Sequence, residues 1–85
     1  MPKIYNDSKF TVYIYTNDHQ PAHVHVFPGR KGNQPDMKIT IGNEEQRPRL
    51  IKKDRSITNK DAIAALKLVA QHQQEFLSRW EDIHG

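Results

Sequence analysis

The feature that most constrains the fold is an amphipathic segment of about six helical turns in the C-terminal third of the sequence. Thr58 is a good N-cap residue, and Asp61 follows three positions later, as in a capping box with Asp in place of Glu. Apolar residues then recur at spacings of three, four or seven: Ala62, Leu66, Val69, Phe76, Trp80 and Ile83. A flanking row at intervals of seven contains Ile63, Ala70, Leu77 and His84. Gln73 is the one polar interruption. This pattern predicts a single long helix with one broad apolar stripe.

A partner surface for that stripe is predicted in the first half of the chain, where apolar and polar residues alternate as in half-buried strands. Such alternation covers residues 10–16, 23–26 and 37–41, and Leu50-Ile51 forms the centre of a short fourth strand. The predicted apolar face contains Phe10, Val12, Ile14, Val24, Val26, Met37, Ile39 and Ile41. Sheet and helix must cover each other, because nothing else in the chain can. We therefore expect one α+β domain over residues 1–85, with a three- to four-stranded antiparallel sheet and one long C-terminal helix packed on one face.

Composition narrows the functional classes. The chain has 85 residues and no cysteine, which excludes a thiolate nucleophile and a cysteine-based zinc site. No apolar run approaches the length of a signal peptide or a membrane span, so we expect a cytoplasmic protein with no membrane partner. A formal net charge of +3 favours anionic partners such as RNA, DNA or an acidic protein only slightly.

Histidines gather on the face that this packing leaves open. If Val24 and Val26 face the helix, His23 and His25 face away from it. In a hairpin, Tyr13 and Tyr15 share that outer face, Lys38 points outwards from the third strand, and His19 lies in a loop at the edge. The predicted outer face therefore combines imidazoles, phenols and an ammonium group.

The histidine pattern fits more than one chemistry. Three neutral imidazoles from His19, His23 and His25 could hold zinc or nickel and leave a position open for water. Without any cofactor, His23 and His25 could act on RNA as general acid and base, assisted by His19, as a metal-independent ribonuclease would. A solvent-exposed cluster with a structural role fits the composition as well.

Other residues would complete a nucleic-acid surface. Arg30, Lys31 and Lys38 could contact phosphates, while Tyr13 or Tyr15 stacks on a base. A basic run follows, containing Arg47, Arg49, Lys52, Lys53 and Arg55. That run is typical of a solvated loop, although it could also track a phosphate backbone.

Three stretches of the sequence resemble a known family. They are MPKI at residues 1–4, NDHQPAHVHV at 17–26 and EFLSRW at 75–80. Together they are similar, over nearly the whole chain, to the small bacterial domain-of-unknown-function family four-one-six-zero, whose members share an Asn-Asp-His-x-Pro-Pro-His-aromatic-His core. Ala22 stands where that pattern has a second proline, and Val24 where it has an aromatic residue.

The resemblance implies a functional context. Genes of this family often adjoin those of domain-of-unknown-function family two-four-four-two, and the pair is suspected to be a toxin–antitoxin module with this family on the toxin side. The resemblance makes His19, His23 and His25 the preferred functional residues and gives Asp18 the role of orienting an imidazole. Our leading expectation is a toxin-like component that acts on RNA through the histidine face, with a small antitoxin-like protein from an adjacent gene as partner. The alternatives are a non-enzymatic module that binds the adjacent gene's product and a histidine-ligated divalent-metal protein.

Overall fold

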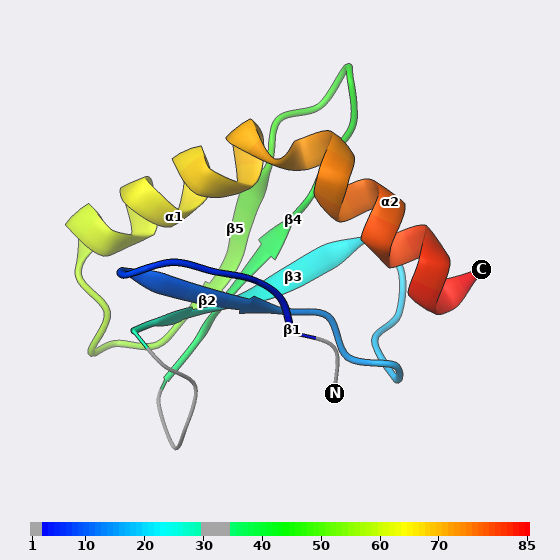
Figure 1. Cartoon of the computed structure of the whole chain (residues 1–85). Helices are drawn as coiled ribbons and strands as arrows, with labels where there is room; N and C mark the ends of the chain where they lie inside the picture. Colours follow the sequence, from blue (N-terminus) through cyan, green and yellow to red (C-terminus); the bar gives the residue numbers. More distant parts are fainter. Residues whose placement is uncertain (1–2, 30–34) are drawn as a thin grey trace.

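The computed structural model describes residues 3–29 and 35–85 and contains one antiparallel sheet. Its strand order, β1-β2-β3-β4-β5, follows the sequence, so every strand pairs with its neighbours along the chain (Figure 1). The strands are β1 Lys3–Asn6, β2 Phe10–Tyr13, β3 His23–Pro28, β4 Met37–Thr40 and β5 Arg49–Lys53. The antiparallel α+β prediction is confirmed, whereas the predicted number of three or four strands is too low.

The additional strand is β1, which pairs with β2 at one edge of the sheet. Only Ile4 of its four residues is buried, and Tyr5 packs partly against the core. Two apolar positions give no readable alternation, so hydrogen bonding to β2 defines this strand more than its own pattern does. At the opposite edge, the strand predicted around Leu50-Ile51 is confirmed as β5.

The predicted single helix is wrong, because two helices follow the sheet: α1 Asn59–Gln71 and α2 Gln73–His84. The predicted start is confirmed, since Thr58 Oγ1 accepts a hydrogen bond from the Asp61 backbone N–H at 3.1 Å. His72 lies between the helices with φ −108° and ψ 20°, well away from helical values. The ribbon changes direction between α1 and α2 (Figure 1).

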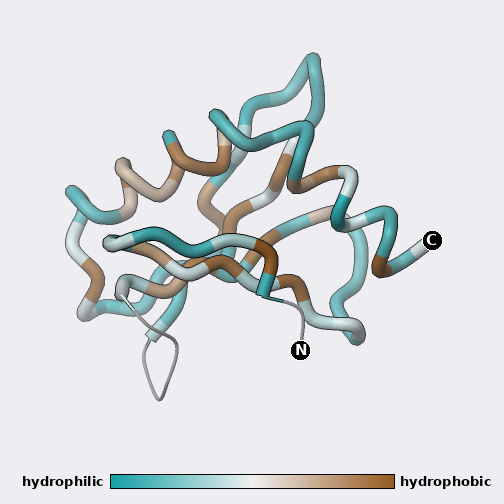
Figure 2. The backbone as a smooth tube through the Cα atoms, viewed as in Figure 1, coloured by the Kyte–Doolittle hydropathy of each residue, from teal (hydrophilic) through white to brown (hydrophobic). Residues whose placement is uncertain are grey.

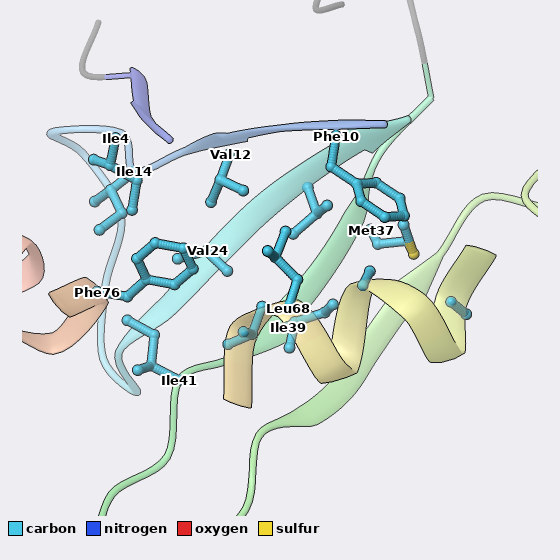
Figure 3. Packing of buried hydrophobic residues seen from close by; sticks show 14 of the residues in the cluster. Ile4, Phe10, Val12, Ile14, Val24, Met37, Ile39, Ile41, Leu68 and Phe76 are labelled. Atoms are coloured by element: carbon cyan, nitrogen blue, oxygen red, sulfur yellow. The ribbon is translucent and has the colours of Figure 1, made fainter. Parts of the chain in front are cut away.

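Both helices cover the same face of the sheet (Figure 1). The eight predicted apolar sheet positions are all buried, and they pack against residues from both helices: Ala62, Ala65, Leu68, Val69, Phe76 and Trp80. Figure 3 shows Leu68 and Phe76 pointing towards the sheet residues. Ile63 is 55% exposed, so the predicted flanking row does not contribute to the core along its whole length.

Polar and apolar segments separate clearly along the chain. Hydrophobic residues gather in the strands and on the helices, while the connection between β4 and β5 is hydrophilic (Figure 2). Within residues 3–29 and 35–85, no helix is long and apolar enough to cross a membrane.

Candidate metal centre

His23 and His25 lie on β3, and their side chains leave the sheet opposite to Val24 and Val26, which are fully buried in the core. His25 pairs across the sheet with Tyr13 on β2 and with Lys38 on β4, so the predicted outer face is present. His23 is nevertheless only 3% exposed. Its ring lies against the Trp80 ring of α2, with 5.4 Å between centroids. One of the two imidazoles is therefore buried, although both were expected on an open surface.

The loop between β2 and β3 places a carboxylate over these imidazoles. Asp18 Oδ2 accepts the Tyr15 backbone N–H at 2.9 Å, and the Asp18 backbone N–H donates to the Tyr15 carbonyl at 3.1 Å. The end of the loop is fixed to β4 by a hydrogen bond of 3.0 Å from the Ile41 N–H to the Ala22 carbonyl. These bonds define the position of the Asp18 side chain, because a turn closed at both backbone and side chain has little freedom.

Asp18, His23 and His25 bring their ligand atoms together. Asp18 Oδ1 lies 3.1 Å from His25 Nε2 and 3.4 Å from His23 Nε2, and one ligand atom from each residue lies within 4.8 Å of the other two. Bonds of about 2.0–2.2 Å to a shared metal ion would separate neighbouring ligand atoms by about 3.0–3.5 Å. These two separations match two edges of such a coordination polyhedron.

The other nitrogen of each imidazole is held by an oxygen acceptor. His23 Nδ1 lies 2.8 Å from the Pro21 carbonyl oxygen, and His25 Nδ1 lies 3.0 Å from Asp36 Oδ2. A carbonyl oxygen only accepts, so His23 Nδ1 carries the hydrogen. His25 faces a carboxylate at each nitrogen, so a neutral His25 ring donates to one of them and presents its lone pair to the other. In neutral His23, and in the His25 tautomer that donates to Asp36, the Nε2 lone pair is directed towards Asp18. Metal-binding histidines in proteins show the same second interaction, which fixes the tautomer and the ring orientation.

His23 Nε2 is buried and has no hydrogen-bond partner among the described residues. Asp18 Oδ1 at 3.4 Å is within ion-pair range, but a lone pair facing a carboxylate is repulsive. An unsatisfied buried polar atom costs about 1–3 kcal/mol. The group therefore needs a positive charge between the imidazole nitrogens and the carboxylate, either as protons on Nε2 or as a bound cation.

Charge and burial act in opposite directions on Asp18. Burial raises the pKa of its carboxyl group, but hydrogen bonds from Tyr15 N–H and His25, together with the nearby imidazoles, lower it further than burial raises it. The net result is a lowered pKa, so Asp18 is ionised near neutral pH. An ionised carboxylate beside two oriented imidazoles is a suitable set of ligands for a cation.

The predicted site residues are only partly brought together. His23 and His25 are in the group, whereas His19 is exposed and lies outside it. Tyr15 and His25 have ring centroids 4.7 Å apart, and Tyr13 stacks on Tyr15 at 5.9 Å.

Lys38 is half-buried on the outer face, opposite His25. Arg30 and Lys31 were also predicted to contact phosphate, and both lie outside the described residues.

Two contributors were not predicted from the sequence in these roles. Asp18 was expected only to orient an imidazole, and Asp36 was not singled out. The spacing Asp18-x4-His23-x-His25 is a usable signal for the first, since it joins a turn carboxylate to two histidines on one strand face. Asp36 has no such local signal, because it comes from the segment before β4.

Residues 10–81 match the family model described as Domain of unknown function (DUF4160). The chain belongs to this family. The DUF4160 match includes the three residues of the group, Asp36 that contacts His25, and most of both helices. Comparisons with curated proteins and with solved structures gave no match.

Proposed function

We propose that this DUF4160 protein binds a divalent transition-metal ion through Asp18, His23 and His25. One observation carries the proposal: two imidazole Nε2 atoms converge on one carboxylate, while both Nδ1 atoms are held by oxygen acceptors. A bound cation would also give the buried His23 Nε2 the partner that it lacks among the described residues. A metal ion bound at the two Nε2 atoms would leave the Nδ1 hydrogen bonds of His23 and His25 in place.

The ligand set selects a class of metal. Two imidazole nitrogens and one carboxylate oxygen suit zinc, iron(II), cobalt and nickel, whereas calcium and magnesium prefer oxygen ligands alone. Three protein ligands leave at least one position for water or for a substrate atom. Water bound to zinc in such an open site has a pKa of about 7 and can supply hydroxide near neutral pH.

The geometry gives less support to metal-independent acid–base catalysis on RNA. A general acid or base must reach the substrate proton directly or through one water. His23 is almost fully buried, and its Nδ1 is engaged by the Pro21 carbonyl. Both nitrogens of His25 are within hydrogen-bond distance of carboxylates. We therefore favour metal binding over direct proton transfer by these histidines.

Isothermal titration of tag-free protein with Zn²⁺ tests this proposal. We expect one ion per chain for the wild type and loss of that site in Asp18→Asn, which keeps the shape of the side chain but removes its charge. Asp36→Ala should weaken binding about 10- to 100-fold, because it removes the acceptor that orients His25. His19→Gln is the matched control, and its affinity should equal that of the wild type.

Circular dichroism of each variant would show that it is folded. Equal zinc affinity in the wild type and in folded Asp18→Asn would refute the proposal. So would a stronger effect of His19→Gln than of Asp18→Asn, since the ligands would then be different.

A further inference from the structure

Two lysines lie beside the candidate metal centre, in a row of residues that crosses the sheet. Across the sheet, Tyr13, His25, Lys38 and Lys52 lie opposite one another on β2, β3, β4 and β5. Neighbouring strands are about 4.8 Å apart, so two ammonium side chains start about 5 and 10 Å from the backbone of a proposed metal ligand. Lys38 is half-buried and Lys52 is exposed.

A second row runs parallel to the first and leads into a groove. His23 pairs with Thr40, and Thr40 pairs with Arg49 on β5. Thr40 and Arg49 line a groove of about 870 Å³ between the sheet and the end of α2, together with Pro21, Arg47 and Trp80. Pro21 and Trp80 also contact the His23 ring, so the groove adjoins the candidate metal centre.

The cations of these rows form no ion pair among the described residues, although the charge of Lys52 also helps to lower the pKa of the exposed Asp54 carboxyl group. Among residues 3–29 and 35–85, every ion pair involves a histidine, and none involves Lys38, Lys52 or Arg49. Like charges on adjacent strands repel one another, and Lys38 lies directly opposite Lys52. An anion between them would relieve that repulsion.

Aromatic rings lie on the other side of the metal centre. Tyr15 is next to His25, and Tyr13 stacks on Tyr15, both being half-buried on this outer face. Proteins bind single-stranded nucleic acids through these two kinds of group: aromatic rings stack on the bases, and cations contact the phosphates. An acidic protein would use the cations without the rings.

We infer that the outer face binds a single-stranded nucleic acid, with phosphates on Lys38, Lys52 and Arg49 and a phosphate oxygen on the open position of the metal ion. This inference rests on the proposed metal site. Zinc binds phosphate oxygen as a Lewis acid, so metal and cations would act on the same backbone.

Fluorescence anisotropy with a labelled 12-nucleotide RNA, and with DNA of the same sequence, tests the inference on zinc-loaded and EDTA-treated protein. We expect Lys38→Glu/Lys52→Glu to weaken RNA binding at least about tenfold at low salt, and to reduce the slope of log K against log salt by about 1.4. Lys60→Glu/Lys67→Glu is the matched control, with the same change of charge on exposed positions of α1. It should retain most of the affinity. Weaker binding after EDTA treatment would support the phosphate–metal contact.

The same proteins separate the two proposals. If zinc titration is normal but both double variants lose RNA binding equally, the inference is overturned and the metal proposal stands. If RNA binds on the outer face without any zinc binding, the metal proposal fails, and so does the part of the inference that uses the ion. Equal affinity for DNA would also support the inference, which names no sugar, whereas preference for polyglutamate over RNA would overturn it in favour of an acidic protein.

Discussion

At the scale of single residues, burial determines the chemistry available to His23. A histidine on the outer face of a sheet is ordinarily solvated, but Trp80 and the loop that carries Asp18 cover this one. The ring is then held in one tautomer by the Pro21 carbonyl. A ring fixed in this way loses the freedom to exchange protons with a substrate but gains a preset direction for a ligand bond.

The lowered pKa of Asp18 predicts a pH dependence of stability in metal-free protein. Its ionised form is favoured by folding, so its contribution is fully present above the ordinary Asp pKa of about 3.9 and is lost as the pH falls through the lower folded value. We expect wild type to be more stable than Asp18→Asn near neutral pH and the difference to shrink below about pH 4. Urea unfolding at a series of pH values measures it.

Two other carboxyl groups with a lowered pKa do not affect the comparison of wild type with Asp18→Asn. Hydrogen bonds from the Phe10 and Lys9 backbone lower the pKa of Asp7, and those from Ser56 lower the pKa of Asp54. Both residues are present in the two proteins, so the difference isolates Asp18. A stability difference that grows with acidification would mean that the carboxylate is not stabilised by folding.

The residue-level predictions succeeded where a strand's own alternation was sufficient. The burial of Val24 and Val26 determines which way His23 and His25 point, and alternation of apolar and polar residues makes that visible in the sequence. The position of Asp18 depends on a closed turn with Tyr15, and the burial of His23 depends on Trp80, some 57 positions later. The contact of His23 with Trp80 is long-range and leaves no local pattern, whereas the turn of Asp18 with Tyr15 spans only three positions.

At the scale of elements, Gln73 explains the one polar position in the predicted helical stripe. It starts α2 and donates from Nε2 to the Ile41 carbonyl, at 2.9 Å, just after β4. The helix break at His72 brings this side chain to the sheet. A polar residue in an apolar stripe thus marked a contact between elements.

Replacing Gln73 with Leu should destabilise the protein by about 1–3 kcal/mol, because it removes the donor and leaves the Ile41 carbonyl unsatisfied in a partly buried place. Chemical denaturation measures the change. Gln74→Leu is the control, since Gln74 is exposed one position later and should change stability by no more than about 0.5 kcal/mol. Equal effects of the two substitutions would exclude the proposed role of the hydrogen bond.

Element boundaries were predictable where side chains mark them. Thr58 and Asp61 marked the start of α1 correctly because capping is a local interaction. The break at His72 contains neither proline nor glycine, and the apolar spacing continues across it, so nothing local distinguishes two helices from one. β1 was missed because four residues with one buried position carry too little pattern.

At the scale of the whole molecule, the two helices cover one face of the sheet (Figure 1), and Tyr13, His25 and Lys38 lie on the other face. That division of faces followed from the sequence, because each apolar surface had only the other to cover it. A metal ion would join the loop between β2 and β3 to the strand at the centre of the sheet. In an 85-residue domain, such a link adds stability that a small core supplies only sparingly.

The toxin-like role and the partner from an adjacent gene stay predictions. They arose from the family resemblance, and membership of DUF4160 supplies a domain of unknown function. The structure adds a specific group of candidate metal ligands, Asp18, His23 and His25, to that family context, so metal binding is the first biochemical question to test.

A crystal structure of zinc-loaded protein, with the ion located by anomalous scattering at the zinc edge, tests the central claim most directly. We predict one strong peak bonded to Asp18 Oδ1, His23 Nε2 and His25 Nε2 at about 2.0–2.2 Å, with His19 away from it. A peak coordinated by His19 or by surface histidines, with the Asp18–His23–His25 group free of metal, would contradict the account.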